Sequence, residues 1–358
     1  MMRSFTSFFK LVPAFSITVL LILIFEFSLY FIPDLYKIDA AGPFFVHYKR
    51  EIAEDKTKEF DILILGDSRS LSLKAHNKSE TNPYSMYNFS LPAAGARYYP
   101  FLLKKYLSHH VNKPKLVVWA GDLRQFKKEN TINFVEDKKI FNEYKHRLLN
   151  LFSFSETWEQ YSGQELFFMF RQYLPTYLLT YKFRQGFEVF VGARLESLFK
   201  LRSHLRDRND LITKLAETNN GQINLGTFFF TNEQGFAEKE FQKQSKYYNT
   251  EERTMKPLVD FLEYTKKENI PFVVLALPQA KGFYETLFFK TVRQDIDSIT
   301  KQYSHATYLE FPNMDYDISL FAEAIHYNDK GDSVVNKEFK ELVYPQLIKI
   351  LEEKNAKK

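Results

Sequence analysis

The feature that constrains the fold most is the apolar run from Phe60 to Leu65, which is followed at once by Gly66, Asp67 and Ser68. A short run rich in branched side chains is typical of a strand buried on both faces, as in a parallel sheet. Gly66 allows a tight turn after it, so Asp67 and Ser68 are expected at the carboxyl end of the strand. Ligands and catalytic groups gather at that edge in open α/β sheets. The alternative is an ordinary strand-to-helix turn in which Ser68 or Ser70 caps the helix.

Four further runs of the same kind follow along the chain. They lie at residues 86–91, 115–121, 271–277 and 306–311, and helical apolar spacing occurs at residues 98–109, 254–268, 282–302 and 331–353. Strands that alternate with helices indicate a parallel sheet covered on both faces. The sequence therefore predicts an α/β fold with five parallel strands, built from residues 60–126 and 250–358.

Residues 127–249 interrupt this pattern and contain no comparable buried run, although residues 228–230 could form a short strand. Amphipathic helical spacing with many aromatic side chains occurs at residues 151–170, 173–190 and 193–215. We interpret the segment as a helical insertion or cap over the sheet. Its apolar faces can pack on the core, on a membrane surface or on a partner, and packing on the core is the favoured interpretation.

The N-terminal part of the chain predicts a membrane anchor. Residues 11–32 are almost wholly apolar, and about 20 apolar residues suffice for a helix to span a bilayer. Arg3 and Lys10 precede this segment, which places residues 1–10 in the cytoplasm and the rest of the chain outside it, in the periplasm. Glu26 is costly there unless it is paired or lies near an interface. We expect a single-pass helix in contact with the lipid bilayer, followed by a linker at residues 33–59, and a cleaved signal peptide is the alternative.

Composition excludes several classes of function. The chain has 49 Lys and Arg residues against 44 Asp and Glu residues, and this mildly basic balance is spread along its length. Because there is no basic stripe of the kind that binds nucleic acid, no nucleic-acid partner is expected. The absence of cysteine excludes disulfides, thiolate metal sites and cysteine nucleophiles. No spacing of His, Asp and Glu typical of a metal site occurs either, so we expect neither a metal nor another cofactor.

Acyl chemistry by a serine requires a base for the hydroxyl proton, an acid that orients the base, and donors for the oxyanion. His326 lies in the loop after the fifth predicted strand, at the same sheet edge as Ser68. Glu323 precedes it by three residues, and positions three apart face the same way in a turn or short helix. Glu323 could therefore hold one ring nitrogen of His326 and leave the other for Ser68, with Asp315 and Asp317 as reserve carboxylates.

These motifs together resemble the SGNH (GDSL) hydrolase superfamily. The resemblance covers residues 60–124 and 254–350 and implies a flavodoxin-like three-layer α/β/α fold. It implies that Ser68 is the nucleophile, that His326 and Glu323 supply base and acid, and that the backbone N–H groups of Ser68 and Gly95 form an oxyanion hole. Asp67 would lie beside this substrate site.

One branch of that superfamily is more similar than the rest. The Gly-Asp-Ser-Arg form of the turn and the segment from Asn88 to Gly95 resemble membrane-anchored proteins that O-acetylate exopolysaccharides such as alginate, or that carry D-alanine onto teichoic acids. This resemblance implies that Asn88 lies on the substrate side. It also implies an acyl-donor membrane protein as a partner and an envelope glycan or lipid as substrate.

Two departures from the superfamily pattern affect the expected activity. The acid is normally Asp, and here it is Glu323, which has a longer arm. The third block is normally Gly-x-Asn-Asp, but the segment from Ala120 to Arg124 has no Asn that could donate to the oxyanion. Loss of one such donor costs about a hundred- to thousandfold in rate, so either Arg124 substitutes or the activity is specialised or weak.

The sequence thus predicts an extracytoplasmic serine acyltransferase or esterase that moves a small, acetyl-like group on an envelope glycan or lipid. The alternative is a non-catalytic envelope protein that uses an SGNH-like scaffold for binding or assembly. Binding of a phosphate or sugar phosphate at the turn from Gly66 to Ser70 is a third option. The distance between the Ser68 hydroxyl and the His326 ring discriminates catalysis from binding.

Overall fold

The computed structural model describes residues 3–31, 41–80, 82–92, 99–127, 178–182, 204–224 and 236–355. Two compact units divide the chain. One comprises Met1–Phe44 and Ser153–Asp210, and the other comprises Phe45–Phe152 and Leu211–Lys358. The second unit contains the sheet and every residue of the site described below.

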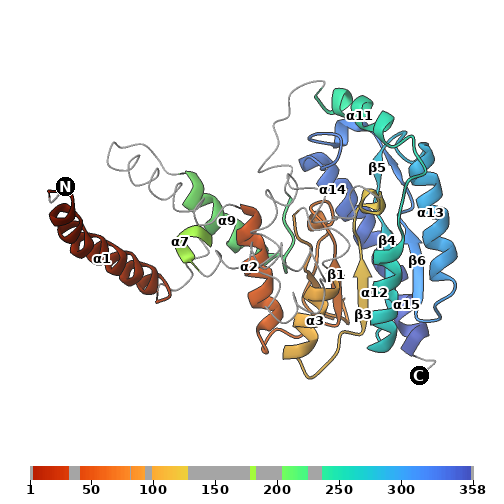
Figure 1. The fold of residues 1–358 in the computed structure, drawn as a ribbon. Helices are drawn as coiled ribbons and strands as arrows, with labels where there is room; N and C mark the ends of the chain where they lie inside the picture. The colour runs from red at the N-terminus through yellow and green to blue at the C-terminus, as the bar shows by residue number, and fades with distance from the viewer. Residues whose placement is uncertain are drawn as a thin grey trace. The chain divides into compact units, whose positions relative to one another are not determined.

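The core of the second unit is a five-stranded sheet in which all neighbouring strands are parallel. Its strands, in spatial order, are β2 (Met86–Asn88), β1 (Ile62–Leu65), β3 (Leu116–Trp119), β4 (Phe272–Ala276) and β6 (Ala306–Glu310) (Figure 1). This is the doubly wound order of flavodoxin-like folds, which reverses direction between β1 and β3. Every residue of β1, β3 and β4 is buried. The predicted five-stranded parallel sheet is confirmed.

Helices cover both faces of this sheet. They are α3 (Tyr99–His109), α12 (Lys256–Lys267), α13 (Leu287–Thr300), α14 (Asp329–Glu338) and α15 (Tyr344–Asn355). Right-handed crossovers place α3, α12 and α13 on one face, because these connections all advance in one direction along the sheet. The chain returns over the other face through α14 and α15 (Figure 1).

The last predicted helix, 331–353, is interrupted by a π-helical segment, η7 (Phe339–Val343). Pro345 lies two residues after this segment and has no N–H for the carbonyl of Glu341 in the preceding turn. The wider turn uses the preceding N–H instead, since Tyr344 N donates to Phe339 O. A second element absent from the sequence predictions is a two-stranded parallel sheet, in which β5 (Gln279–Ala280) pairs with β7 (Asp315–Tyr316). It joins the segments that follow β4 and β6.

Within the predicted linker at 33–59, residues Ala41–Glu54 form the helix α2. Lys49 on this helix is fully buried. Its Nζ donates to the carbonyl of Gly221 at 2.6 Å and to that of Asn88, and it lies 4.9 Å from the centre of the Tyr87 ring. Burial lowers the pKa of Lys49 well below its ordinary value. Lys49 thus ties α2 to the end of β2 and to a turn far along the chain.

Replacing Lys49 with methionine is expected to lower the free energy of unfolding by about 1–3 kcal/mol, because two buried carbonyls lose their donor. Methionine keeps the apolar stem, so the loss reports the hydrogen bonds rather than packing. Denaturant unfolding of the variant measures it. Lys56→Met is the matched control. Lys56 lies just after α2 and is exposed, so its replacement should change the free energy of unfolding little. Equal free energies of unfolding for the two variants would show that the hydrogen bonds of Lys49 do not stabilise the fold.

The first unit contains α1 (Arg3–Leu29) and α7 (Leu179–Lys182). Glu26 is buried and accepts hydrogen bonds from the backbone N–H of Thr180, at 3.3 Å, and from its hydroxyl. Within the part of the chain that the structure describes, no helix combines the length and apolarity that crossing a membrane requires. The predicted membrane span at 11–32 therefore has no support from the structure.

Most of the predicted helical insertion at 127–249, including the short strand at 228–230, lies outside the described residues. The described pieces contain the helices α7, α9 (His204–Thr218) and α11 (Phe236–Tyr247). Helix α11 belongs to the unit that holds the sheet, and it contacts η6 (Ile318–Leu320), in the loop that leads to His326.

Candidate active site

Ser68 lies in the turn that directly follows β1. The carboxylate of Asp67 accepts the N–H of Arg69 at 3.0 Å, and the hydroxyl of Ser70 donates to the Asp67 carbonyl at the same distance, so the turn is held from both sides. Asp67, Arg69 and Ser70 are buried, whereas Ser68 is half-buried. The short helix that follows, η2 (Ser70–Ser72), has Arg69 at its N-cap position and no side-chain cap. The alternative of a serine acting as helix cap is therefore wrong.

Gly66 is required by the close approach of two segments. A Cβ atom at this position would lie 2.0 Å from the Ser70 hydroxyl oxygen and 2.9 Å from the carbonyl of Ala120. The backbone of Ala120 cannot yield without moving β3, because its N–H is bound to Leu65 O at 2.8 Å. Any side chain here therefore displaces the serine turn.

Gly66→Ala is expected to lower the free energy of unfolding by about 1–3 kcal/mol. We also expect it to slow the reaction of Ser68 with a serine-directed fluorophosphonate by about 10- to 100-fold, since a displacement of about 1 Å in a catalytic group has effects of this size. Thermal unfolding and the labelling rate measure the two effects. A variant that is destabilised but reacts at the wild-type rate would show that the turn tolerates the displacement.

The loop after β7 brings Glu323 and His326 to the same side of a tight turn. An antiparallel bridge between Phe321 and Tyr327 closes this turn, and Ala322 N donates to the His326 carbonyl at 2.8 Å. Oε1 of Glu323 accepts both the backbone N–H of His326, at 2.9 Å, and its ring Nδ1. The three-residue spacing therefore lets one carboxylate oxygen hold the histidine by its backbone and its ring.

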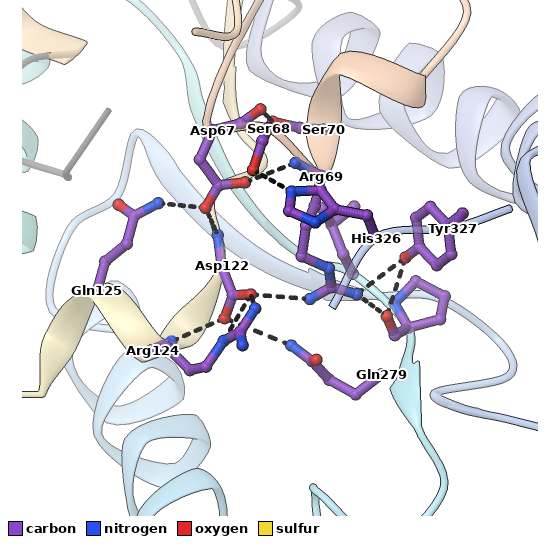
Figure 2. Close-up of polar contacts among 12 residues, drawn as sticks. Asp67, Ser68, Arg69, Ser70, Asp122, Arg124, Gln125, Gln279, His326 and Tyr327 are labelled. Atoms are coloured by element: carbon purple, nitrogen blue, oxygen red, sulfur yellow. Dashed lines mark hydrogen bonds and ion pairs between the residues drawn. The ribbon is translucent and has the colours of Figure 1, made fainter. Parts of the chain in front are cut away.

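The other ring nitrogen of His326 faces the serine turn. Its Nε2 lies 2.7 Å from Ser68 Oγ, although 258 positions separate the two residues (Figure 2). Glu323, His326 and Ser68 thus form a continuous hydrogen-bonded chain of carboxylate, imidazole and hydroxyl. In such a chain the imidazole can take the hydroxyl proton and the carboxylate can stabilise the resulting imidazolium.

The Glu323 carboxylate, at one end of these hydrogen bonds, is held in its charged form. Burial alone raises the pKa of Glu323, but the hydrogen bonds from His326 and the charge of Arg124 outweigh burial and hold that pKa below its ordinary value. The two reserve carboxylates lie elsewhere. Asp317 caps η6 by accepting Ser319 N at 2.9 Å, and Asp315 lies exposed on β7.

A buried polar cluster lies next to the triad of Ser68, His326 and Glu323. It is centred on Asp122, which follows β3. Its N–H donates to Asp67 Oδ2 at 2.8 Å, and its carboxylate binds Arg69 Nη1 at 3.2 Å and Arg124 Nε at 2.9 Å (Figure 2). Burial raises the pKa of Asp122, but the two guanidinium groups outweigh it and hold that pKa far below its usual range. Burial and the nearby negative charge of Asp122 both raise the pKa of Asp67.

Four residues are expected from the sequence to bind the oxyanion or the substrate, and each has its own outcome. Gly95 lies outside the described residues. Asn88 serves the fold, because both hydrogens of its amide are donated to backbone carbonyls, those of Ser70 at 2.7 Å and Leu73 at 2.9 Å. Arg124 binds Asp122 and, at 3.0 Å, Gln244 of α11, so the structure gives no support to its expected role as substitute oxyanion donor. Asp67 faces Asp122 rather than the space above Ser68.

Sequence reasoning missed two buried residues of the site, Arg69 and Tyr327, which directly follow Ser68 and His326. The adjacency was a usable signal, because a turn that exposes one side chain often buries the next. Gln125 and Gln279 were also missed. Gln125 donates to Asp67, and Gln279 Nε2 lies 3.4 Å from Asp122 Oδ1.

The fold and the site define an α/β protein that carries a Ser-His-Glu arrangement at the carboxyl edge of a parallel sheet. The chain belongs to the family described as protein of unknown function (DUF1574), whose sequence profile matches residues 42–330. This match spans the strands of the sheet together with Ser68, Glu323 and His326. A comparison with curated proteins gave no match.

Proposed function

We propose that this protein is a serine acyltransferase or acyl esterase. The observation that supports the proposal best is the unbroken hydrogen-bonded chain from Glu323 through His326 to Ser68. The structure describes no group of His, Asp and Glu residues that could hold a metal ion, and the proposed chemistry uses protein side chains alone.

The reaction begins when Ser68 Oγ attacks the carbonyl carbon of an acyl ester while its proton passes to His326 Nε2. The carbonyl oxygen takes the negative charge, and the backbone N–H of Ser68 is the proposed donor to it. His326 then returns the proton to the leaving alkoxide, which leaves an acyl group on Ser68. In the second half the acceptor hydroxyl, or water, attacks this ester, and His326 again takes and returns the proton.

The size of the acyl group and the nature of the acceptor rest on the resemblance to SGNH hydrolases and their envelope acyltransferase branch. We propose a small acetyl-like group, an envelope glycan or lipid as acceptor, a membrane-bound acyl donor and a location outside the cytoplasm. These elements derive from the sequence motifs alone.

The test is labelling of the full chain with a serine-directed fluorophosphonate, alongside hydrolysis of a short-chain aryl ester. Ser68→Ala should abolish both without changing the unfolding midpoint. The matched control is Ser108→Ala, because Ser108 Oγ also lies beside a histidine, 3.0 Å from His109 Nδ1, on the exposed surface of α3. Labelling that persists in Ser68→Ala would remove Ser68 from the role.

A non-catalytic binding or assembly protein is the second candidate, favoured by the missing amide donor between Ala120 and Arg124. Under that hypothesis the wild-type chain would neither react with the probe nor hydrolyse the ester. The distance of 2.7 Å from Ser68 to His326 supports the catalytic proposal over this one.

A further inference from the structure

A second link joins the serine turn to the histidine loop, beside the one between the catalytic groups. Arg69 follows Ser68, and Tyr327 follows His326. Nη2 of Arg69 donates to the hydroxyl of Tyr327 at 3.0 Å, and this bond also spans 258 positions (Figure 2). The residue after each catalytic group is therefore bound to the residue after the other.

The same guanidinium reaches two further segments. Its Nη1 lies 3.2 Å from Asp122 Oδ2, after β3, and its Nη2 also donates to the carbonyl of Pro278, after β4. The hydroxyl of Tyr327 donates to that carbonyl at 2.9 Å. One planar group thus fixes the ends of three strands and the histidine loop, which a lysine ammonium on its flexible stem cannot do in the same geometry.

Stability of the fold alone does not explain this arrangement. Arg69 is only 1% exposed, and a buried ion pair often contributes less stability than apolar side chains of similar volume. What a buried ion network can supply is a defined geometry. The geometry in question is that of Ser68 against His326, because Arg69 and Tyr327 flank them.

We propose that Arg69 and Tyr327 are positioning residues that hold the Ser68 hydroxyl within reach of His326, an inference that rests on the function proposed above. Among the hydrogen bonds that the structure describes, those of the Arg69 and Tyr327 side chains go to each other, to Asp122 and to the Pro278 carbonyl. Their effect is on the fraction of molecules in which the hydroxyl and the imidazole are aligned, and a displacement of about 1 Å lowers a rate by about 100-fold.

The test is a double-mutant cycle with Arg69→Met, Tyr327→Phe and the double variant. The fluorophosphonate labelling rate is measured per folded molecule and as a function of pH. Each single change should slow labelling by about 10- to 100-fold, and the double variant should be no slower than Arg69→Met, because both changes remove one link. The rise of the labelling rate with pH should flatten in all three variants, because the general base then contributes less to the reaction.

Two features keep the result interpretable. Tyr327→Phe retains the ring that packs 5.3 Å from Phe321 and 6.1 Å from Tyr316, so it carries the test if Arg69→Met does not fold. The matched control is Arg293→Met, which removes a two-pronged ion pair with Glu310 on α13 and β6, at 2.8 and 2.6 Å. It should lower stability and leave the labelling rate unchanged.

Three outcomes decide the matter. Slowed labelling with a flattened pH profile and non-additive effects supports the proposal. Wild-type rate and pH profile in Tyr327→Phe, or strictly additive effects, would overturn it while the proposed function stands. A wild-type chain that does not react at all would instead overturn the proposed function, and the positioning role with it.

Discussion

Replacing His326 with alanine is expected to lower the rate of Ser68 acylation by about 10⁴-fold or more, because the hydroxyl then loses the group that takes its proton. A serine hydroxyl without a base is a poor nucleophile at neutral pH. The single-turnover rate of acyl-enzyme formation with a short-chain aryl ester measures the effect, and the unfolding midpoint shows whether the fold survives. Since the imidazole is largely buried in the loop, a modest loss of stability is also expected.

The matched control is His109→Ala. His109 also lies beside a serine, but it lies on α3, and among the described residues its ring contacts Ser108 and the carbonyl of Lys105, at 2.9 Å, rather than a carboxylate. Its removal should leave acylation unchanged. A His326→Ala variant that acylates within tenfold of the wild type would mean that another group activates Ser68.

Glu323→Gln is expected to lower the same rate by about 10⁴-fold, because a neutral amide can hold the imidazole in the wrong tautomer and does not stabilise the imidazolium. Glu323→Asp should recover part of the activity, since it restores the charge on a shorter arm. Asp317→Asn serves as control. Asp317 lies in the segment that leads to this loop, where its carboxylate caps η6 by accepting the N–H of Ser319. Equal rates in Glu323→Gln and Asp317→Asn would remove Glu323 from the triad.

The contribution of Glu323 to stability is expected to depend on pH. Because the pKa of Glu323 in the fold lies below its ordinary value of 4.5, the charged carboxylate stabilises the folded chain. This contribution is present above that value and is lost as the pH falls through the lower, folded-state pKa. The stability difference between wild type and Glu323→Gln should therefore narrow in acid. Denaturant unfolding at pH 7 and below pH 4 measures it, and a difference that widens in acid would contradict the assigned charge.

The parts of the fold that were predictable are those encoded locally. Each strand of the main sheet lies within a largely apolar run of six or seven residues in the sequence, and the edge at which Ser68 and His326 meet follows from parallel strands alone. Glu323 could be predicted as the partner of His326 because it lies three residues before it. Each of these inferences needs only short-range spacing and one rule of sheet geometry.

What could not be predicted depends on partners far away in the chain. Asn88 ends the strand β2, where a substrate ligand is expected, but its amide donates to backbone carbonyls 15 and 18 positions earlier. The guanidinium of Arg124 is oriented by Asp122 and by Gln244, which lies 120 positions later. The strands β5 and β7 have two residues each, too few for any periodicity. The direction of a side chain in a loop is set by such contacts, and the sequence pattern carries no signal for them.

The separation of Ser68 and His326 by 258 positions has a consequence for the newly made protein. At about 5–20 residues per second, roughly 13–50 s of translation pass between the two residues. During that interval the serine turn has neither its base nor the anchor that Tyr327 supplies. On the function proposed above, Ser68 does not react in a nascent or truncated chain. Its reactivity begins only after the last strand and the loop that follows it have been synthesised.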